Sequence, residues 1–376
     1  MKTKLDFQLL KKKGKARAGK ITLNNKTITT PVFMPVGTKA TIKGMVLDML
    51  NDPKYTGLDK KIGIILANTF HLYLNPGDDT IKNFGGLHNF QNWDGLILTD
   101  SGGYQVFSLG LDKRTSRNKS LVKIKDDGVG FKSPKDGSSH IFTPEKVVDI
   151  QINLGSDIMM VLDVCSPVHG NNKKKTAQQM HLTHKWADKA FDYFGYKYND
   201  TKSVLFPIVQ GGLHEDLRQE SLEYLKKYSW DGIAIGGVSV GETKEEMYQV
   251  VEWLSNTLPE EKPRYLMGVG TPEDLEHTIY QGIDMYDCVL PTRLARHGVA
   301  FHSSGEKVRI KNSANKMSKK PLDENCGCFA CKNFARGYIH HLFKEKEMLG
   351  GILLSLHNIV HLHKLTEEIK EKILHS

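Results

Sequence analysis

Leu96-Ile-Leu-Thr-Asp-Ser-Gly-Gly-Tyr-Gln105 is a short apolar run that ends in a carboxylate, a hydroxyl, two glycines, an aromatic ring and an amide. This pattern predicts a buried strand followed by a loop that reaches a ligand. In α/β folds the strand fixes the position and the residues just after it carry the chemistry. Taken alone, the segment is also compatible with an ordinary glycine turn in which Asp100 caps a helix.

Similar apolar runs recur along the chain, most of them rich in β-branched residues and followed at once by Gly, Asp, Asn, Gln or Ser. The eight runs are Thr30–Pro35, Ile62–Ala67, Gly95–Thr99, Asp157–Leu162, Val204–Val209, Gly232–Ile235, Arg264–Met267 and Met285–Leu290. Helix signals separate most of them, such as Thr143-Pro-Glu145 and Thr271-Pro-Glu-Asp274, where a capping residue precedes proline. Eight alternating strand–helix units predict an α/β fold of the (β/α)₈ TIM-barrel type. An open doubly wound sheet is the alternative, but no Gly-x-Gly-x-x-Gly follows the first strand.

The alternation breaks between Leu111 and Phe142. Val122–Lys125 and Val129–Lys132 alternate with period two around Asp126-Asp-Gly128, which predicts a β-hairpin inserted after the third strand. The segment is basic and contains Lys113, Arg114, Arg117, Lys119, Lys123, Lys125, Lys132 and Lys135. We expect it to overhang the barrel mouth, although a solvated surface flap fits the sequence equally well.

The composition is that of a folded protein with a basic surface. Of the 376 residues, 39% are hydrophobic and 25% are charged, and the formal net charge is +9. A positive balance suits a polyanionic partner such as RNA. The chain has no apolar run of about 18 residues and no apolar N-terminal signal, so we expect a cytoplasmic protein without a membrane span.

The five cysteines are an odd and clustered set, which argues against a disulfide framework. Cys326, Cys328 and Cys331 lie within six residues, a spacing typical of a structural Zn²⁺ site. Free cysteines in a turn are the alternative. Several downstream histidines could supply the fourth ligand: His340, His341, His357, His361 and His363.

Three more expected strand ends carry polar residues. Asp163 follows the fourth run, Gln210-Gly-Gly212 follows the fifth, and Asp287 lies in the eighth. Each alone has an ordinary explanation as a cap, a turn residue or an ion-pair partner. In a barrel, however, they converge on one face, which favours an active site.

Three such acids suit substitution at the anomeric carbon of a sugar. One carboxylate attacks and forms a glycosyl-enzyme intermediate, while another exchanges a proton with the leaving group. A third carboxylate can accept hydrogen bonds from a purine, a glutamine and a backbone N–H can donate to its carbonyl, and aromatic or thioether groups can cover its faces. Spacing alone does not assign these roles.

The chain closely resembles one known family. Its motifs look like the signature segments of the tRNA-guanine transglycosylases, the queuine tRNA-ribosyltransferase family, and the similarity runs from about Phe7 to His363. The segments are Asp100-Ser-Gly-Gly-Tyr-Gln-Val-Phe-Ser108, Gln210-Gly-Gly212, Gly236-Gly-Val-Ser-Val-Gly-Glu242, Tyr265-Leu-Met-Gly-Val-Gly-Thr-Pro-Glu-Asp274 and Asp287-Cys-Val-Leu-Pro-Thr-Arg293.

The resemblance implies a barrel with a C-terminal zinc subdomain that replaces guanine at the tRNA anticodon wobble position with a 7-deazaguanine. It implies Asp287 as the nucleophile and Asp100 as the general acid/base. It implies base contacts from Ser101, Tyr104, Asp163, Gln210, Gly237, Val238, Glu242 and Met267. It implies RNA contacts from Arg293 and Arg296, and one structural Zn²⁺ on Cys326, Cys328, Cys331 and His357.

Finer expectations also follow from the resemblance. Cys165 and Val240 match the bacterial pocket, which accepts the aminomethyl precursor preQ1, with Glu242 sensing that group through the Val238–Ser239 backbone. The chain departs from the commonest bacterial pattern at Val164, directly after Asp163, so queuine stays open as the natural base. The tRNA partner would carry a GUN-type anticodon.

The expected organisation is a catalytic barrel over residues 1–302, a zinc-binding subdomain over 303–365 and a charged helix end over 366–376. The aromatic residues Phe334 and Tyr338 are expected to mediate a homodimer. Two rival functions remain: an enzyme for phosphorylated sugars that uses Gly236-Gly237 and Gly268-x-Gly270 to hold phosphate, and an inactive RNA-binding partner subunit.

Overall fold

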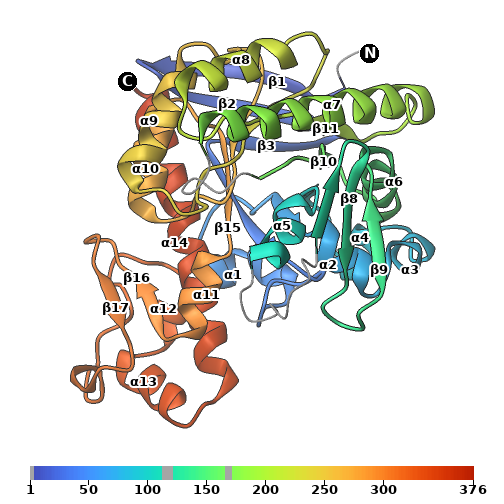
Figure 1. The fold of residues 1–376 in the computed structure, drawn as a ribbon. Coiled ribbons are helices and arrows are strands. Elements are labelled where there is room, and N and C mark those ends of the chain that lie inside the picture. Colours follow the sequence, from blue (N-terminus) through green and yellow to red (C-terminus); the bar gives the residue numbers. More distant parts are fainter. Residues whose placement is uncertain (1–3, 112–121, 166–171) are drawn as a thin grey trace.

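A computed structural model describes residues 4–111, 122–165 and 172–376 (Figure 1). Its centre is a parallel barrel, and this confirms the predicted fold class. The sheet order is β11-β10-β6-β5-β4-β15-β14-β13-β12. The strands are β4 (Val32–Gly37), β5 (Ile64–Ala67), β6 (Leu96–Thr99), β10 (Ile158–Met160), β11 (Val204–Phe206), β12 (Ile208–Val209), β13 (Ile233–Ile235), β14 (Arg264–Leu266) and β15 (Met285–Cys288).

The barrel closes through a single run of chain around Pro207. On one side of this proline, β11 pairs with β10; on the other, β12 pairs with β13. Proline has no N–H to donate to a ladder, so the run is divided into two strands. The Pro207 carbonyl still accepts a hydrogen bond from Ala234 N at 2.9 Å, a distance typical of a β-ladder. The nine strands therefore correspond to the eight predicted runs.

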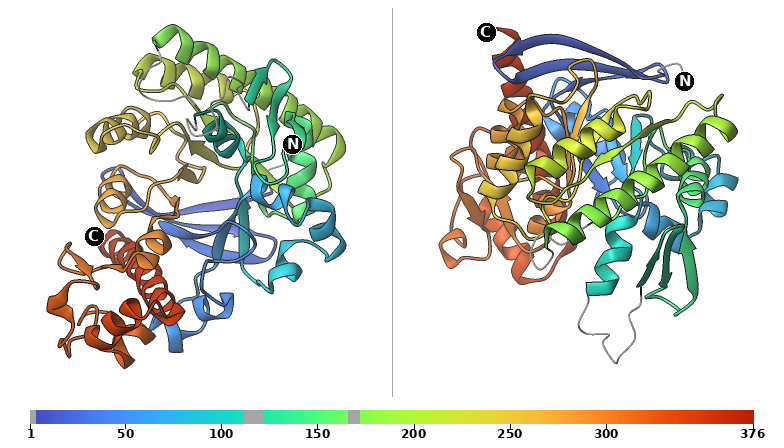
Figure 2. Two further views of the ribbon diagram at one scale, coloured as in Figure 1. Left: turned by 60° about the horizontal axis from the view of Figure 1, so that its bottom comes forward. Right: turned by 45° about the horizontal axis from the view of Figure 1, so that its top comes forward.

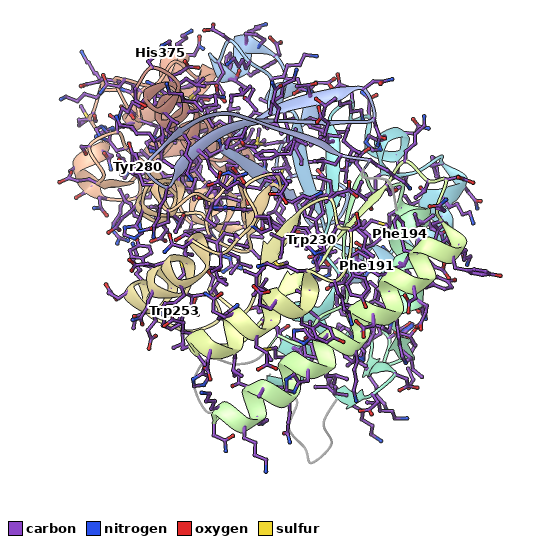
Figure 3. All side chains as sticks on the ribbon, turned by 90° about the horizontal axis from the view of Figure 1, so that it is seen from above. Phe191, Phe194, Trp230, Trp253, Tyr280 and His375 are labelled. Atoms are coloured by element: carbon purple, nitrogen blue, oxygen red, sulfur yellow. The ribbon has the colours of Figure 1, made fainter. Side chains whose placement is uncertain are left out.

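Helices follow most of the strands and cover the barrel (Figures 1 and 2). The predicted caps are present, since the side chains of Thr143 and Thr271 each accept a hydrogen bond from a first-turn amide. Asn172 caps α7 (Lys173–Lys197) in the same way. Figure 3 shows Phe191 and Phe194 on the side of α7 that faces the barrel, where both are buried in the core. The helices around the barrel are α2 (Thr69–Leu74), α3 (Asp78–Asn83), α4 (Leu87–Gln91), α5 (Gly103–Leu111), α6 (Pro144–Leu154), α7 (Lys173–Lys197), α8 (Glu215–Leu225), α9 (Lys244–Ser255), α10 (Pro272–Tyr280) and α11 (Leu290–Arg296).

An N-terminal antiparallel sheet, which was not predicted, precedes the barrel. It consists of β1 (Asp6–Lys13), β2 (Ala16–Leu23) and β3 (Lys26–Thr30). Arg17 of β2 donates from Nε to Asp284 Oδ1 at 3.0 Å, and Asp284 directly precedes β15. The sheet is thereby tied to the end of the barrel where β15 begins, opposite the end where the predicted site lies.

The insertion after β6 contains the predicted hairpin and one more strand. β7 (Val122–Lys125) pairs with β8 (Gly128–Lys132) as expected, but β9 (Ser139–Phe142) adds a third strand. The buried rings of Phe131 and Phe142 lie 5.0 Å apart, and Phe131 also packs on Phe70 of α2. The extra strand gives the hairpin an apolar face to bury. The basic residues Lys113, Arg114, Arg117 and Lys119 lie outside the described residues.

The C-terminal region begins with β16 (Val299–Phe301) and β17 (Lys307–Arg309) and continues with α12 (Phe329–Asn333), α13 (Arg336–Lys344) and α14 (Met348–Leu374). Helix α14 passes the expected boundary at residue 365 without a break and packs on β1, β2 and β4. Within its last turns, Ile369 and Ile373 are buried. Among the described residues, no helix has both the length and the apolar character that would let it cross a membrane.

Candidate active site

The polar residues predicted at the strand ends gather at one end of the barrel. Asp100 follows β6, Asp163 comes shortly after β10, Gln210 follows β12 and Asp287 lies in β15. Asp163 receives hydrogen bonds from Ser101 Oγ at 3.2 Å and from Gln210 Nε2 at 2.7 Å. The charge of Asp287 acts on Asp100. The carboxyl ends of parallel strands meet at one rim, which explains why residues so distant in sequence come together.

Asp100 is held by amides from two directions. Its Oδ1 accepts from Thr69 N at 3.0 Å and from Gly102 N at 3.2 Å, and its Oδ2 accepts from Asn68 Nδ2. Burial raises the pKa of Asp100 to about 7, and the negative charge of Asp287 acts in the same direction, against the effect of the amide donors. The pKa of Asp100 therefore lies near neutral pH, where a carboxyl group can both release and accept a proton.

Asp287 has one oxygen fixed and the other free. Its Oδ1 accepts from Tyr265 Oη at 2.6 Å and from Gly268 N at 2.8 Å, while its Oδ2 has no hydrogen-bond partner in the described part of the chain. Burial raises the pKa of Asp287, opposed by the Tyr265 and Gly268 hydrogen bonds. Tyr265 was not singled out in the sequence analysis. It lies in strand β14 beside β15, so alternation along that strand is the only signal that could have indicated it.

Asp163 and Gln210 form the inner wall of the site. Asp163 is only 6% exposed, and burial raises its pKa to about 6 in spite of the hydrogen bonds from Gln210 and Ser101. The loop after β13 packs closely on Gln210: a Cβ atom added to Gly237 would lie 2.4 Å from Gln210 Oε1. The φ angle of Gly237 is +64°, so both space and backbone conformation require glycine here.

The next residues of this loop are held by Glu242. Its two carboxylate oxygens accept from Ser239 N and from Val240 N, the latter at 2.9 Å. A trans peptide directs its N–H and C=O to opposite sides. Because the Ser239 N–H points to Glu242, the Val238 carbonyl points away from it.

The residues expected to cover a bound base lie at the opening. Tyr104, in the first turn of α5, has 52% of its surface exposed, and Met267, just after β14, is half-buried. Met267 packs with part of its side chain against the core, and both side chains keep surface that a ligand can reach.

Several basic side chains from separate segments lie near the site. Arg293 and Arg296 are exposed on α11. Burial lowers the pKa of Lys43, and the positive charges of Arg296, Lys39 and Arg293 lower it further. Lys135 acts with Lys39 and Lys43 to lower the pKa of His71, after the larger effect of burial. The two arginines were expected from the sequence, whereas Lys39 and Lys43 are far from them in the chain, carry no motif, and follow β4, the neighbour of β15 in the barrel.

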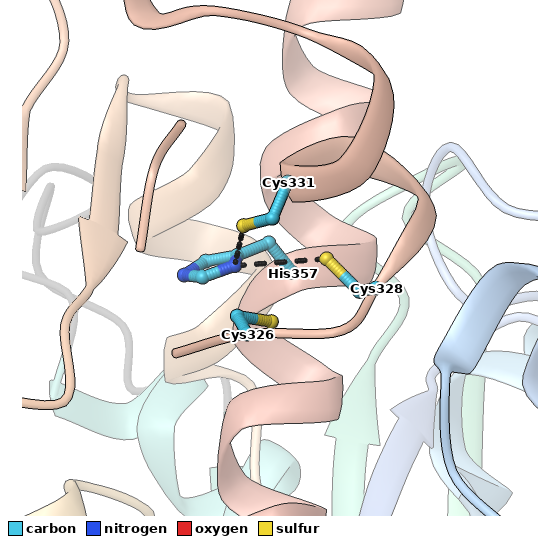
Figure 4. A group of neighbouring side chains, drawn as sticks. All are labelled: Cys326, Cys328, Cys331 and His357. Carbon is cyan, nitrogen blue, oxygen red and sulfur yellow. Dashed lines mark hydrogen bonds between the residues drawn. The ribbon is translucent and has the colours of Figure 1, made fainter. Parts of the chain in front are cut away.

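The predicted metal ligands form one buried group (Figure 4). Ligand atoms of Cys326, Cys328, Cys331 and His357 all lie within 4.8 Å of one another. His357 Nδ1 lies 3.3 Å from Cys331 Sγ, while His357 Nε2 is 2.8 Å from the Phe301 carbonyl oxygen and donates to it. This second hydrogen bond leaves the Nδ1 lone pair for a metal. None of the other histidines considered belongs to the group, and His340 is instead bonded to the Ile310 carbonyl.

The raised pKa of Asp100 predicts a pH effect on stability. Between the unfolded value near 4 and the folded value of about 7, the folded state binds more protons, so wild-type stability falls as the pH rises through this range. Asp100→Asn removes this dependence. We expect the difference in Tm, variant minus wild type, to become more positive by about 2–4 °C between pH 5 and pH 8. Thermal unfolding at both pH values measures it, and a difference that stays constant or falls would contradict the raised pKa.

The comparisons with known proteins agree with this geometry. The family model described as "Queuine tRNA-ribosyltransferase" matches residues 12–376. Three relatives carry the same name. The one from Caldanaerobacter subterraneus subsp. tengcongensis is 48% identical over 98% of this chain and 93% of its own. Those from Francisella tularensis subsp. novicida and Fusobacterium nucleatum subsp. nucleatum are 46% and 48% identical, each over 99% of this chain and 95% of its own. The chain belongs to the queuine tRNA-ribosyltransferase family, the tRNA-guanine transglycosylases.

Proposed function

We propose that the protein exchanges guanine at the anticodon wobble position of tRNA for a 7-deazaguanine, as a step of queuosine modification in the cytoplasm. The observation that carries the proposal is the pairing of two unlike carboxylates at one rim. One carboxylate oxygen of Asp287 is free, and the other accepts hydrogen bonds from two donors. Asp100, on which the charge of Asp287 acts, has a pKa near neutral pH. Family membership supports the same activity.

The reaction proceeds by double displacement. The free oxygen of Asp287 attacks C1′ of the ribose, the bond from C1′ to guanine breaks, and neutral Asp100 protonates the departing base. The incoming base then loses a proton to Asp100, attacks C1′ and displaces Asp287. Two inversions give net retention, and the proton returns to its original carrier.

The base is recognised at the inner wall. Asp163 accepts from the N–H and amino groups of the purine edge, while Gln210 and the Gly237 N–H donate to its carbonyl. Ser101 orients Asp163, and Tyr104 and Met267 cover the two faces of the ring. Recognition of this kind requires a base that has left its stack, which suits the single-stranded anticodon loop.

We propose preQ1 as the natural base, with queuine as the alternative. The Val238 carbonyl, directed away from Glu242, is available to accept from an aminomethyl ammonium, and Glu242 adds a compensating negative charge. Glu242→Ala should raise KM for preQ1 by about 10- to 100-fold, because a charged hydrogen bond is weakened, with little change in KM for guanine. Equal changes in both constants, measured by base incorporation into tRNA, would contradict this role.

The tRNA has a GUN-type anticodon and is held by the positive rim. Arg293 and Arg296 bind phosphates or nucleotides flanking the target, and Lys39, Lys43 and Lys135 extend the positive surface. The strength of tRNA binding should accordingly fall as the salt concentration rises.

The Cys₃His group holds a structural Zn²⁺. Three buried thiols and one imidazole suit the tetrahedral coordination of this ion and leave no position for a substrate. When bound, the ion joins the loop around Cys326 to α14. It takes no part in the exchange reaction.

A homodimer forms through the region that follows the cysteine loop. The rings of Phe334 and Tyr338 stack at 5.4 Å with an interplanar angle of 18°, and Tyr338 remains 43% exposed. Phe334 is half-buried and supports the exposed Tyr338, and an exposed aromatic ring of this kind is typical of interface anchors. Light scattering that gives the mass of one chain at micromolar concentration would exclude the dimer.

The direct test of the proposed function is incorporation of labelled guanine and labelled preQ1 into a tRNA whose anticodon begins with G. Wild-type protein should label this tRNA and should not label free guanosine. Exchange into free nucleosides would instead favour the sugar-directed alternative. No labelling of either substrate would favour an inactive RNA-binding subunit.

A further inference from the structure

Arg218 of α8 is a fully buried arginine at the site that forms no ion pair with any described residue. Its side chain is 0% exposed. Instead of a carboxylate, it binds backbone carbonyls at the end of β12 and in the loops after β12 and β13. The four acceptors are Gly212 at 2.9 Å from Nε, Val209 at 3.0 Å and Gly236 at 2.7 Å from Nη1, and Gly237 at 3.2 Å from Nη2.

Burying a cation that forms no direct ion pair is costly, even though the negative charge of Glu242 acts on it, so its position calls for a specific reason. The guanidinium joins the two loops that line the inner wall. Gln210 lies between the first two acceptors, Val209 and Gly212, and Gly237 is itself an acceptor. A planar group with five donors can satisfy several carbonyls at once, which a lysine ammonium cannot do with the same geometry.

The hydrogen bonds of Arg218 also fix the direction of backbone donors. Because a trans peptide has its C=O and N–H on opposite sides, a Gly236 carbonyl bonded to Arg218 directs the Gly237 N–H away from the guanidinium. The Gly237 carbonyl directs the Val238 N–H in the same manner. Neither N–H has an acceptor in the described part of the chain, so both remain available for a ligand. Hydrogen bonds from a cation to these carbonyls also polarise the peptides and strengthen their N–H groups as donors.

We infer that Arg218 is a positioning residue that presents the Gly237 N–H and Gln210 to the purine and thereby sets the affinity for the base. This inference rests on the proposed function. The hydrogen bonds of Arg218 go to backbone carbonyls and not to Asp100 or Asp287. Its loss should therefore weaken binding of the free base much more than it slows the chemical steps.

The chain offers a matched control in Arg264. This second buried arginine, 4% exposed, also donates to several carbonyls, which belong to Pro259, Ser255, Gly282 and Leu258. It begins β14, at the end of the barrel opposite the site. Replacing either arginine removes similar hydrogen bonds from the core. Only Arg218, however, bonds to the loops that are proposed to bind the base.

The experiment compares Arg218→Lys, Arg218→Met and Arg264→Lys in the full chain. Each variant is assayed for Tm, for kcat, for KM of guanine and for KM of tRNA. For Arg218→Lys we expect KM of guanine to rise about 10- to 100-fold, the effect of weakening charge-assisted hydrogen bonds, with kcat and KM of tRNA within about threefold of wild type. Arg218→Met should show at least as large an effect. Arg264→Lys should lower Tm without raising KM of guanine.

Several outcomes would overturn the inference. One is a folded Arg218→Lys whose KM of guanine stays within about twofold of wild type, since the lost hydrogen bonds would then be unimportant for the base. Another is an Arg218→Lys that does not fold while Arg264→Lys does, because the role would then be structural. Failure of the wild-type protein to label tRNA would instead refute the proposed function, so the two failures are distinguishable.

Discussion

Asp287→Asn is expected to abolish both base exchange and the covalent RNA adduct. An amide oxygen can still accept from Tyr265 and Gly268, so the fold is retained, but it cannot serve as the nucleophile. By analogy with the loss of other enzymatic nucleophiles, kcat should fall by about four orders of magnitude or more. Denaturing gel electrophoresis of enzyme with tRNA, in the absence of an incoming base, detects the adduct, and labelled guanine measures the exchange.

Asp284→Asn is the matched control. Asp284 is another buried carboxyl, three residues earlier at the opposite end of β15, and it pairs with Arg17 instead of facing the site. Leaving Arg17 buried without its partner should cost about 3–5 kcal/mol of stability. The Asp284→Asn variant should still form the covalent RNA adduct at temperatures where it is folded. An adduct in Asp287→Asn, or normal exchange by it, would refute the assignment of the nucleophile.

Loss of His357 is expected to remove the metal and destabilise the C-terminal region. His357→Asn leaves three thiolates without their fourth ligand and removes the hydrogen bond to the Phe301 carbonyl. The metal content, measured by mass spectrometry of the metal, should fall from one zinc per chain to nearly none. Because structural zinc contributes strongly to folding, Tm should decrease by about 10 °C or more.

His361→Asn provides the comparison. His361 lies on the same helix, and its ring centre is 6.2 Å from that of His357, but it is outside the ligand group. This variant should keep its zinc and most of its Tm. Loss of zinc from His361→Asn with retention in His357→Asn would reverse the assignment of the fourth ligand.

Much of the site could be predicted because its residues follow strands. Asp100, Gln210 and Asp287 each stand at the end of an apolar run, and parallel strands bring such ends to one rim. Tyr265 and Arg218 were missed for a different reason. Tyr265 lies inside a strand and Arg218 inside a helix, where an aromatic ring or a charge has no distinctive local pattern. Their partners come from elements that are distant in sequence.

The fold shows the same division. The hairpin Val122–Lys132 was predicted from the alternation of its residues. Strand β9 was not predicted, because it follows a polar turn and only its pairing with β8 identifies it as a strand. The N-terminal sheet was missed because only the first half of β1 alternates between exposed and half-buried residues, while its last four residues are all exposed and three of them are lysines. It is held in place by long-range contacts such as the ion pair of Arg17 with Asp284.

Several features follow from the sequence alone. They are the eight apolar segments, the capped helices between them, the spacing of the cysteines and the acidic residues at the strand ends. Short-range spacing and periodicity are sufficient for these features. Only the tertiary structure decided that Asp287 keeps one oxygen free and that Arg218 bonds to the Gly237 carbonyl. It also brings His357, which the family resemblance implied, to the three cysteines. These features depend on burial and on contacts between distant segments, and burial is also what brings the pKa of Asp100 to about 7.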